Sequence, residues 1–577
     1  MLKLLRFMRG FRKECILSPL FKMLEAIFEL FIPLVVANII NEAIPKGDVS
    51  NLAFSCGIMA LLGAVGLTCT LFAQYFAAKA SVGFSSKVKR ALFKHVTSLS
   101  YTEIDELGTS TLITRMTSDA NQVQTGVNLT LRLFMRSPVI VFGAMIMAFF
   151  IDLKAGLVFV GAIIILSLIV FGIMCLTIPL YRSVQGKLDS VLDLTRENLK
   201  GARVIRAFRL EDEENIKYRK RTEALNRAQK TVGRISAIMN PATYAIVNIA
   251  ISVLVYVGAI QFNIEGLTPG EVVALYNYMS QILIELIKLA NLIITMTKAI
   301  ACGNRIQSVF EILPSQKKLS QEREENVNIV EFRNAYLKYK NSPEYSLEDI
   351  TFAVKKGETV GIIGSTGSGK SSLVNLIGRF YDCEKGQVLF DGLDVRAYEP
   401  ALLRGKIGYV PQKAVLFKGT LRQNLLWGDE DASDEEIIKA IEAAQVKDVL
   451  DSKPEGLDFM IEQGGKNLSG GQRQRFTIAR ALVGKPEVLV LDDSSSALDY
   501  LTDSRLRQAI KALDYNPTVF IVSQRTASIQ HADKIVVLDD GLIAGIGTHS
   551  QLLNSCTVYS EIYNSQFSSS EKEGDNQ

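Results

Sequence analysis

A run of small residues that ends in lysine and serine has the composition of a phosphate-binding loop. The run comprises Gly364, Ser365, Thr366, Gly367, Ser368, Gly369, Lys370, Ser371 and Ser372. The stretch ETVGIIG before it favours a strand and SLVNLIGRF after it favours a helix, which is the context this motif requires. The glycines allow successive backbone N–H groups to surround an anion. We therefore expect Lys370 to reach the β- and γ-phosphates of a nucleotide and Ser371 to bind Mg²⁺.

An acidic residue farther along the chain complements this loop. The apolar, strand-like stretch PEVLVLDD brings Asp492 to the end of a buried strand. Many buried strands end in aspartate, so this signal is weak alone. Together with the loop it is strong, and it predicts that Asp492 holds the Mg²⁺ of bound ATP. The strand and helix that flank the loop argue against a chance glycine-rich turn.

The segment NLSGGQRQR, residues 467–475, lies between these two elements. At this point the chain resembles the ATP-binding-cassette (ABC) superfamily, whose signature is LSGGQ, and the resemblance covers essentially its whole length. The signature residues are Ser469, Gly470, Gly471 and Gln472. The resemblance implies that they open a helix and donate to the γ-phosphate of ATP bound by an opposing subunit. Two cassettes would then enclose two nucleotides.

Three further segments match the family. Gln412 in VPQKAVLFKGT corresponds to the Q-loop, which implies contacts with Mg²⁺ and with the membrane domain. Residues 496–499 correspond to the D-loop. Tyr339 stands where the family stacks an aromatic ring on adenine, and Tyr336 is the alternative. The implied cofactors are ATP and Mg²⁺, with Ser371, Gln412 and Asp492 as the metal contacts.

Two catalytic positions depart from the family pattern. Asp493 stands where the family has a glutamate that polarises the attacking water, and Gln524 stands where it has a histidine. Exporters also carry glutamate at the position of Gln463. A carboxylate shortened by one methylene withdraws by roughly 1–1.5 Å, and glutamine cannot become a cation near neutral pH. Neutral drift is one interpretation. We favour a degenerate ATP site that binds ATP and hydrolyses it poorly, beside a signature that completes a partner's competent site.

The composition points to a membrane protein with a water-soluble part. Of 577 residues, 48% are apolar and 21% charged, which excludes a disordered chain. The formal net charge of +4 is too small for a dedicated nucleic-acid binder. The seven cysteines form no CxxC pair, so a disulfide framework or zinc site is not expected. Apolar stretches stop near residue 305, and α/β-like sequence follows from about residue 328.

Six stretches are long enough to cross a bilayer. They are about 16–40, 52–80, 131–151, 155–180, 240–262 and 271–300. Lysine and arginine gather in loops 81–130 and 181–239, whereas the opposite loops contain only Lys46 and Lys154. Both long loops, the N-terminus and the ATP-binding part are therefore expected in the cytoplasm of a multi-pass cell-membrane protein. Residues 1–14 are expected either as an amphipathic helix on the cytoplasmic surface or as an unstructured basic flank.

The expected fold is an α-helical membrane domain of six transmembrane helices with long cytoplasmic extensions, followed by an α/β P-loop ABC nucleotide-binding domain. The boundaries are 1–305 for the membrane domain, 306–328 for a linker, 329–565 for the cassette and 566–577 for a flexible tail. Six spans before one cassette resemble the multidrug-resistance-like exporter branch of half-transporters. This resemblance implies coupling helices near 101–115 and 196–212.

Charged residues inside the spans are candidates for contact with cargo. Glu25 and Glu29 share one face of the first span, and Glu285 and Lys288 are close in the last. One hypothesis is an acidic cavity for cationic or amphipathic cargo. The structural alternative pairs Glu25 with Lys22 and Glu285 with Lys288.

The favoured function is that of one subunit in a heterodimeric, ATP-driven exporter. Its partner would be a homologous half-transporter, and its cargo an amphipathic drug, lipid, peptide or other small molecule. A slow homodimeric exporter and a non-pumping ATP-binding regulatory subunit are the alternatives. The sequence leaves the cargo, the identity of the partner and the direction of transport open.

Overall fold

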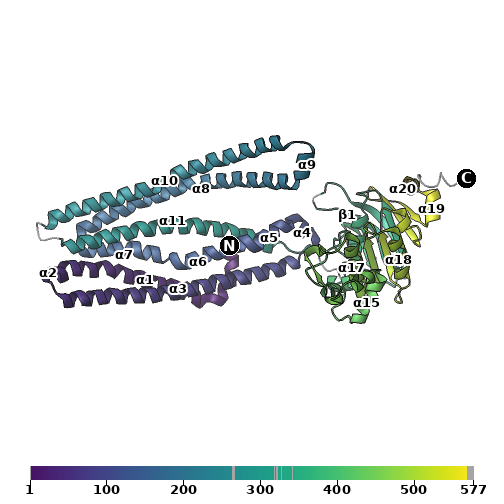
Figure 1. The fold of residues 1–577 in the computed structure, drawn as a ribbon, viewed down its shortest axis with the longest axis horizontal. Coiled ribbons are helices and arrows are strands. Elements are labelled where there is room, and N and C mark those ends of the chain that lie inside the picture. Colours follow the sequence, from purple (N-terminus) through teal and green to yellow (C-terminus); the bar gives the residue numbers. More distant parts are fainter. Residues whose placement is uncertain are drawn as a thin grey trace. The chain divides into compact units, whose positions relative to one another are not determined.

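A computed structural model describes residues 2–262, 267–316, 319, 323–325, 328–340 and 342–567 (Figure 1). The chain divides into two compact units, which are described separately. The first unit comprises Met1–Thr97 and Ser110–Ile312, and the second Ser98–Thr109 and Leu313–Gln577.

The first unit is helical. Its helices are η1 (Leu2–Phe11), α1 (Arg12–Asn38), η2 (Ile39–Ala43), α2 (Ile44–Lys46), α3 (Val49–Thr97), α5 (Thr109–Thr114), η3 (Arg115–Asp119), α6 (Ala120–Leu133), α7 (Arg136–Ile151), α8 (Leu153–Lys200), α9 (Ala202–Ala207), α10 (Glu211–Phe262) and α11 (Pro269–Glu311). Within the described residues, six helical runs are long and apolar enough to span a membrane. The six predicted spans are therefore confirmed.

The longest helices exceed what a bilayer requires. α3 has 49 residues, α8 has 48 and α10 has 52, so each extends over about 70–80 Å, more than twice the hydrocarbon thickness. The predicted helical extensions beyond the membrane are thus present. α8 and α10 run side by side and are joined through α9 at one end (Figure 1). α11 continues to Glu311, so the expected linker 306–328 begins inside this helix.

The first unit also buries a charged cluster that links α1, α7 and α11. The Arg136 side chain, which is 10% exposed, pairs with Glu285 and with Glu29, whose Oε2 lies 2.5 Å from Arg136 Nη2. Glu25 Oε1 lies 3.7 Å from Arg136 Nε, and the Ser137 hydroxyl donates to Glu285 at 2.8 Å. Both pairs of the structural alternative are present as well, Lys22 with Glu25 at 2.5 Å and Lys288 with Glu285 at 2.8 Å.

We expect Arg136→Ala to destabilise the first unit by up to about 3–5 kcal/mol, because the change removes the buried cation that Glu29 and Glu285 share and leaves Glu285 with Lys288 alone. Thermal unfolding of the detergent-solubilised chain measures this loss. Lys154→Ala, which removes an exposed cation at the start of α8, is the control and should leave the unfolding temperature unchanged. Equal unfolding temperatures for the two variants would mean that the cluster does not stabilise the helix packing.

The second unit contains two main sheets. The parallel strands β3 (Thr359–Gly364), β6 (Ile407–Val410), β9 (Val488–Asp492), β10 (Thr518–Val522) and β11 (Lys534–Asp539) form one sheet with the antiparallel edge strand β12 (Leu542–Gly547), in the order β12-β11-β3-β10-β9-β6. The antiparallel sheet β2-β1-β4-β5 contains β1 (Asn328–Leu337), β2 (Leu347–Lys355), β4 (Lys385–Phe390) and β5 (Leu393–Asp394). β7 (Gly419–Thr420) pairs with β8 (Met460–Ile461).

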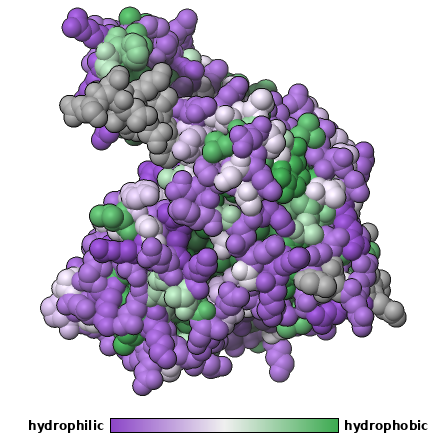
Figure 2. All heavy atoms as spheres, turned by 90° about the vertical axis from the view of Figure 1, so that its right-hand side faces the viewer, coloured by the Kyte–Doolittle hydropathy of each residue, from purple (hydrophilic) through white to green (hydrophobic). Residues whose placement is uncertain are grey.

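Helices surround these sheets. They are α4 (Tyr101–Leu107), α12 (Lys370–Ile377), α13 (Pro400–Gly405), α14 (Leu421–Leu425), α15 (Asp434–Ala443), α16 (Lys447–Asp451), η4 (Gly456–Asp458), η5 (Gln463–Gly465), α17 (Gly470–Val483), α18 (Tyr500–Lys511), η6 (Thr526–Ser528), α19 (His549–Ser555) and α20 (Thr557–Phe567). α20 includes the first two residues of the expected tail 566–577, and 568–577 lie outside the described residues. The face of the molecule drawn in Figure 2 is mostly hydrophilic, with scattered apolar side chains. The predicted α/β cassette after a helical membrane domain is confirmed.

Candidate nucleotide site

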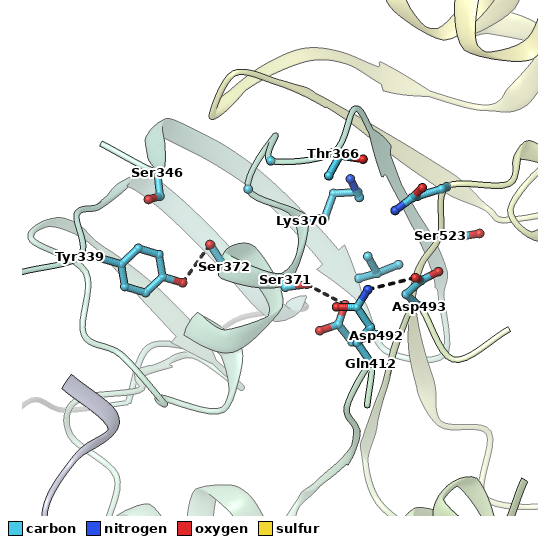
Figure 3. Close-up of a pocket in the computed structure, with 14 residues that line it drawn as sticks. Tyr339, Ser346, Thr366, Lys370, Ser371, Ser372, Gln412, Asp492, Asp493 and Ser523 are labelled. Carbon is cyan, nitrogen blue, oxygen red and sulfur yellow. Dashed lines mark hydrogen bonds between the residues drawn. The ribbon is translucent and has the colours of Figure 1, made fainter. Parts of the chain in front are cut away.

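A cavity of about 350 Å³ opens where β3, β10 and β9 end (Figure 3). β10 lies between β3 and β9 and is parallel to both, so the residues that follow the three strands meet at one edge of the sheet. The cavity is lined by Tyr339, Ser346, Thr366, Gly367, Gly369, Lys370, Ser371, Ser372, Gln412, Asp492, Asp493, Val522, Ser523 and Gln524. Most of the predicted site residues are therefore brought together.

The phosphate loop connects β3 to α12, as predicted. Gly367 and Gly369 have φ of 89° and 94°, in the left-handed region that favours glycine. A Cβ on Gly369 would lie 2.6 Å from the Ser346 carbonyl oxygen, so a larger residue does not fit there. Lys370 Nζ donates to the carbonyls of Gly364 at 2.9 Å and Ser365 at 2.6 Å.

The loop offers what a triphosphate requires. The Ser368 hydroxyl is buried and has no hydrogen-bond partner among the described residues. Lys370 supplies a cation, and burial lowers its pKa, which nearby Asp493 and Asp492 partly offset. An anion with several oxygens would satisfy both groups. These residues fit the phosphates of ATP.

Asp492 lies beside the loop in a position suited to a divalent cation. The Ser371 hydroxyl donates to Asp492 Oδ1 at 2.9 Å, and the Tyr409 hydroxyl donates to Oδ2 at 3.2 Å. Burial raises the pKa of Asp492, although both hydrogen bonds oppose the shift. Tyr409, in β6, was not among the predicted residues. A serine hydroxyl and a carboxylate are oxygen ligands that suit Mg²⁺.

The raised pKa of Asp492 gives ATP binding a pH dependence. A bound Mg²⁺ would require the ionised carboxylate, and protons would compete with it at a higher pH than for an ordinary aspartate. We expect Mg²⁺-dependent ATP affinity to weaken as the pH falls through the mildly acidic range. Titrating a fluorescent ATP analogue at several pH values measures this, with Asp492→Asn as the matched control that lacks the titrating group. A pH profile shared by both proteins would contradict the assignment.

The two departures from the family pattern also lie at this cavity. Gln412 Nε2 donates to Asp493 Oδ2 at 3.2 Å, so the shortened carboxylate is engaged by the Q-loop amide (Figure 3). Asp493 has a φ of 46°, which places it on a tight turn after β9. Gln524 follows β10 and also lines the cavity.

Tyr339 lies at the other end of the cavity. Its hydroxyl is 2.9 Å from the Ser372 hydroxyl in α12, as Figure 3 shows. The alternative, Tyr336, instead forms an edge contact with Tyr345 at 5.7 Å between ring centroids, and it is not part of the cavity lining. The geometry favours Tyr339 for contact with a nucleotide base.

Tyr339 also belongs to a chain of contacts that ends on α4. Its ring packs edge-on against Tyr381, with centroids 5.0 Å apart. The Tyr381 hydroxyl donates to Asp105 of α4 at 2.6 Å. Lys340 pairs with Glu106 of the same helix at 2.6 Å. α4, which comes from the first long loop, is thus packed on the cassette of its own chain.

The signature residues are separate from this cavity. Ser469 caps α17: its hydroxyl accepts from Gln472 N–H at 3.3 Å, and its N–H donates to Gln472 Oε1 at 2.9 Å. Ser469 and Gly470 are exposed, as is Gln463 in the preceding turn. A Cβ on Gly471 would lie 3.1 Å from the Ala497 carbonyl oxygen of the D-loop. The start of α17 therefore lies at the surface of the cassette.

The chain is similar to known proteins over nearly its whole length. The family model "ABC transporter transmembrane region" matches residues 15–286, and the model "ABC transporter" matches residues 347–496. An ABC transporter ATP-binding protein of Bacillus subtilis, YfiB, is 33% identical over 567 residues, covering 98% of this chain and 99% of that protein. The ATP-dependent lipid A-core flippase of Salmonella typhimurium is 28% identical over 569 residues, covering 96% of each.

A solved structure has the same fold. The structure of a bacterial Atm1-family ABC exporter with ATP bound aligns with a TM-score of 0.78 at 23% sequence identity, covering 96% of this chain and 98% of that one.

Proposed function

Because this chain belongs to the ABC transporter family and is a membrane ATPase of that family, we propose that it is the degenerate-site subunit of a heterodimeric, ATP-driven exporter. The proposal depends on one observation above all. An intact phosphate loop and Asp492 share a cavity with an aspartate and a glutamine at the two catalytic positions.

ATP binding requires only the intact part of this site. Lys370 and the loop N–H groups would hold the phosphates, and Tyr339 the base. Ser371, Asp492 and Gln412 would hold Mg²⁺, which neutralises phosphate charge when bound. The hydroxyl of Ser371 already lies 2.9 Å from Asp492, so these two ligands need little rearrangement.

Hydrolysis requires the part of the site that has changed. Asp493 is shorter than glutamate by one methylene, and its carboxylate accepts a hydrogen bond from Gln412. A displacement of about 1 Å at a catalytic group can cost about 10²-fold in rate. Gln524 can donate a hydrogen bond to a γ-phosphate but cannot carry a proton as a histidine can. We therefore expect ATP to bind at this site and to be hydrolysed only slowly.

A partner subunit explains the surfaces that this chain leaves exposed. The signature at the start of α17 would contact ATP held by the partner. α9 exposes Val204, which is followed by exposed Phe208, and the cassette exposes Phe417 and Trp427 with their rings 4.2 Å apart. Apolar side chains outside the membrane are costly in water and suit a protein interface.

Amphipathic compounds remain the proposed cargo. The charged cluster of α1, α7 and α11 contains three cations and three carboxylates that neutralise one another, which favours its structural role over that of an acidic cargo site. The Salmonella relative is named as a lipid A-core flippase, and lipids are among the cargo classes that fit.

The contact between Tyr381 and Asp105 provides a test of coupling. We expect Tyr381→Phe to leave ATP affinity unchanged, since the ring still packs on Tyr339. Transport per ATP hydrolysed should fall by about three- to tenfold, the effect of losing one solvent-exposed hydrogen bond worth about 1 kcal/mol. Tyr398→Phe is the control, because its hydroxyl donates to the Phe390 carbonyl at 3.0 Å, a contact away from α4. Equal coupling in both variants would contradict a role for this bond.

Vesicles containing this chain and its partner test the proposed function directly. ATP should drive concentrative uptake into inverted vesicles, and a pair carrying Lys370→Ala should lose it. Nucleotide-dependent gating of another membrane protein without concentrative uptake would instead favour the regulatory alternative. Uptake by vesicles that contain this chain alone would favour a homodimer.

A further inference from the structure

The segment that carries Gln524 is fixed from two sides. We call residues 523–526 the switch segment. On one side, Arg525 donates to the D-loop carbonyls of Leu498 at 3.4 Å and Ser496 at 3.5 Å. On the other side, a single residue of the last helix, Gln566 in α20, contacts the backbone of the segment.

The Gln566 amide makes three hydrogen bonds to the switch segment. Its Nε2 donates to the Gln524 carbonyl at 2.7 Å. Its Oε1 accepts from the Thr526 N–H and from the Thr526 hydroxyl, each at 2.9 Å. Thr526 is fully buried, so the two bonds that it makes to Gln566 Oε1 are shielded from water, whereas Gln524 and Gln566 are exposed.

α20 is itself anchored in the cassette core. Tyr559 is fully buried, and its hydroxyl lies 2.7 Å from Nδ1 of His549. Val558 and Ile562 pack against the core cluster. Gln566 therefore lies in the last turn of a helix that packs on the core. The carbonyl it contacts belongs to Gln524, whose side chain lines the nucleotide cavity.

We propose that Gln566 is a positioning residue that sets the Gln524 side chain for contact with the γ-phosphate of ATP. The inference rests on the proposed function, because it takes the cavity as an ATP site. Losing the amide frees the Gln524 carbonyl and lets the side chain move away from the γ-phosphate. ADP has no γ-phosphate, so its binding does not depend on this position.

The test compares ATP and ADP affinities of the purified full-length chain, each measured by displacement of a fluorescent ATP analogue in the presence of Mg²⁺. Gln566→Met has a similar size and makes none of the three bonds. We expect it to weaken ATP binding about five- to tenfold and to leave ADP binding unchanged. Gln566→Glu keeps the acceptor for Thr526 and loses the donor to Gln524, so it should behave like Gln566→Met.

Asn564→Ala, on an exposed part of the same helix, is the matched control and should change neither affinity. Equal losses of ATP and ADP binding in Gln566→Met would overturn the proposal, since they indicate a merely structural role. No loss of either affinity would overturn it as well.

Gln524→Ala distinguishes the proposed role of Gln566 from the proposed contact between Gln524 and the γ-phosphate. If it reduces the preference for ATP and Gln566→Met does not, only the role of Gln566 is wrong. If Gln524→Ala changes nothing, the γ-phosphate contact of the proposed function is wrong too.

Discussion

Replacing Lys370 with alanine should lower the ATP affinity of this chain by about two orders of magnitude, the largest effect expected of any single substitution in the cavity. The ammonium group is the cation of the phosphate loop, and its two present acceptors are loop carbonyls that a triphosphate would displace. Removing it leaves the phosphates with the loop N–H groups and the Ser368 hydroxyl, and without the loop's cation. Equilibrium binding of a fluorescent ATP analogue to the purified chain measures the loss.

Lys413→Ala provides the control for this experiment. Lys413 is exposed and follows Gln412 directly, so its removal changes the net charge of the domain equally without touching the cavity. ATP affinity should therefore stay the same. If both lysine variants weaken binding alike, the effect is one of overall charge and the cavity is not the ATP site.

Restoring the two family residues should produce the second large effect. We expect Asp493→Glu with Gln524→His to raise ATP hydrolysis at this site by about 10- to 100-fold. The added methylene carries the carboxylate toward the γ-phosphate, and the imidazole adds a group that can carry a proton. Phosphate release by the purified chain and by the pair with its partner measures the gain.

A matched variant separates the carboxylate from other consequences of the double change. Asp493→Asn with Gln524→His has the new imidazole and no carboxylate, so it should show no gain. Similar rates for the double variant and the unchanged chain would mean that these two positions do not limit hydrolysis.

The clustering of the predicted nucleotide-site residues in one cavity follows from motifs that encode local geometry. A strand, a glycine-rich loop and a helix bring Lys370 and Ser371 together through short-range backbone constraints. Asp492 joins them because β3 and β9 both pair with β10 in parallel, which places their ends together. Asp493 comes directly after β9, and Gln524 comes two residues after β10.

Other residues could not be predicted, because their partners are distant in sequence. Arg136 pairs with Glu29 and Glu285, which lie 107 and 149 positions away, and only helix packing brings them together. Gln566 was assigned to a flexible tail, since a polar C-terminal stretch carries no signal of its own. In the structure it lies in α20 and contacts Gln524, 42 positions away.

The packing of α4 with the cassette could not be predicted from the sequence either. Residues 98–109 interrupt the membrane unit along the chain but belong to the cassette unit in space. Asp105 and Glu106 form their bonds with Tyr381 and Lys340, side chains that nothing in the local sequence connects with them. Family resemblance predicted a coupling helix near 101–115. It did not predict which residues of the cassette this helix contacts.

The proposal of a degenerate site is tested most directly by measuring ATP affinity and ATP turnover on one preparation of the purified chain. Lys370→Ala provides the background for both quantities. Saturable, Mg²⁺-dependent ATP binding with phosphate release no faster than that of Lys370→Ala is the result we predict. Rapid phosphate release by the chain on its own would show that Asp493 and Gln524 support catalysis, and it would contradict the account.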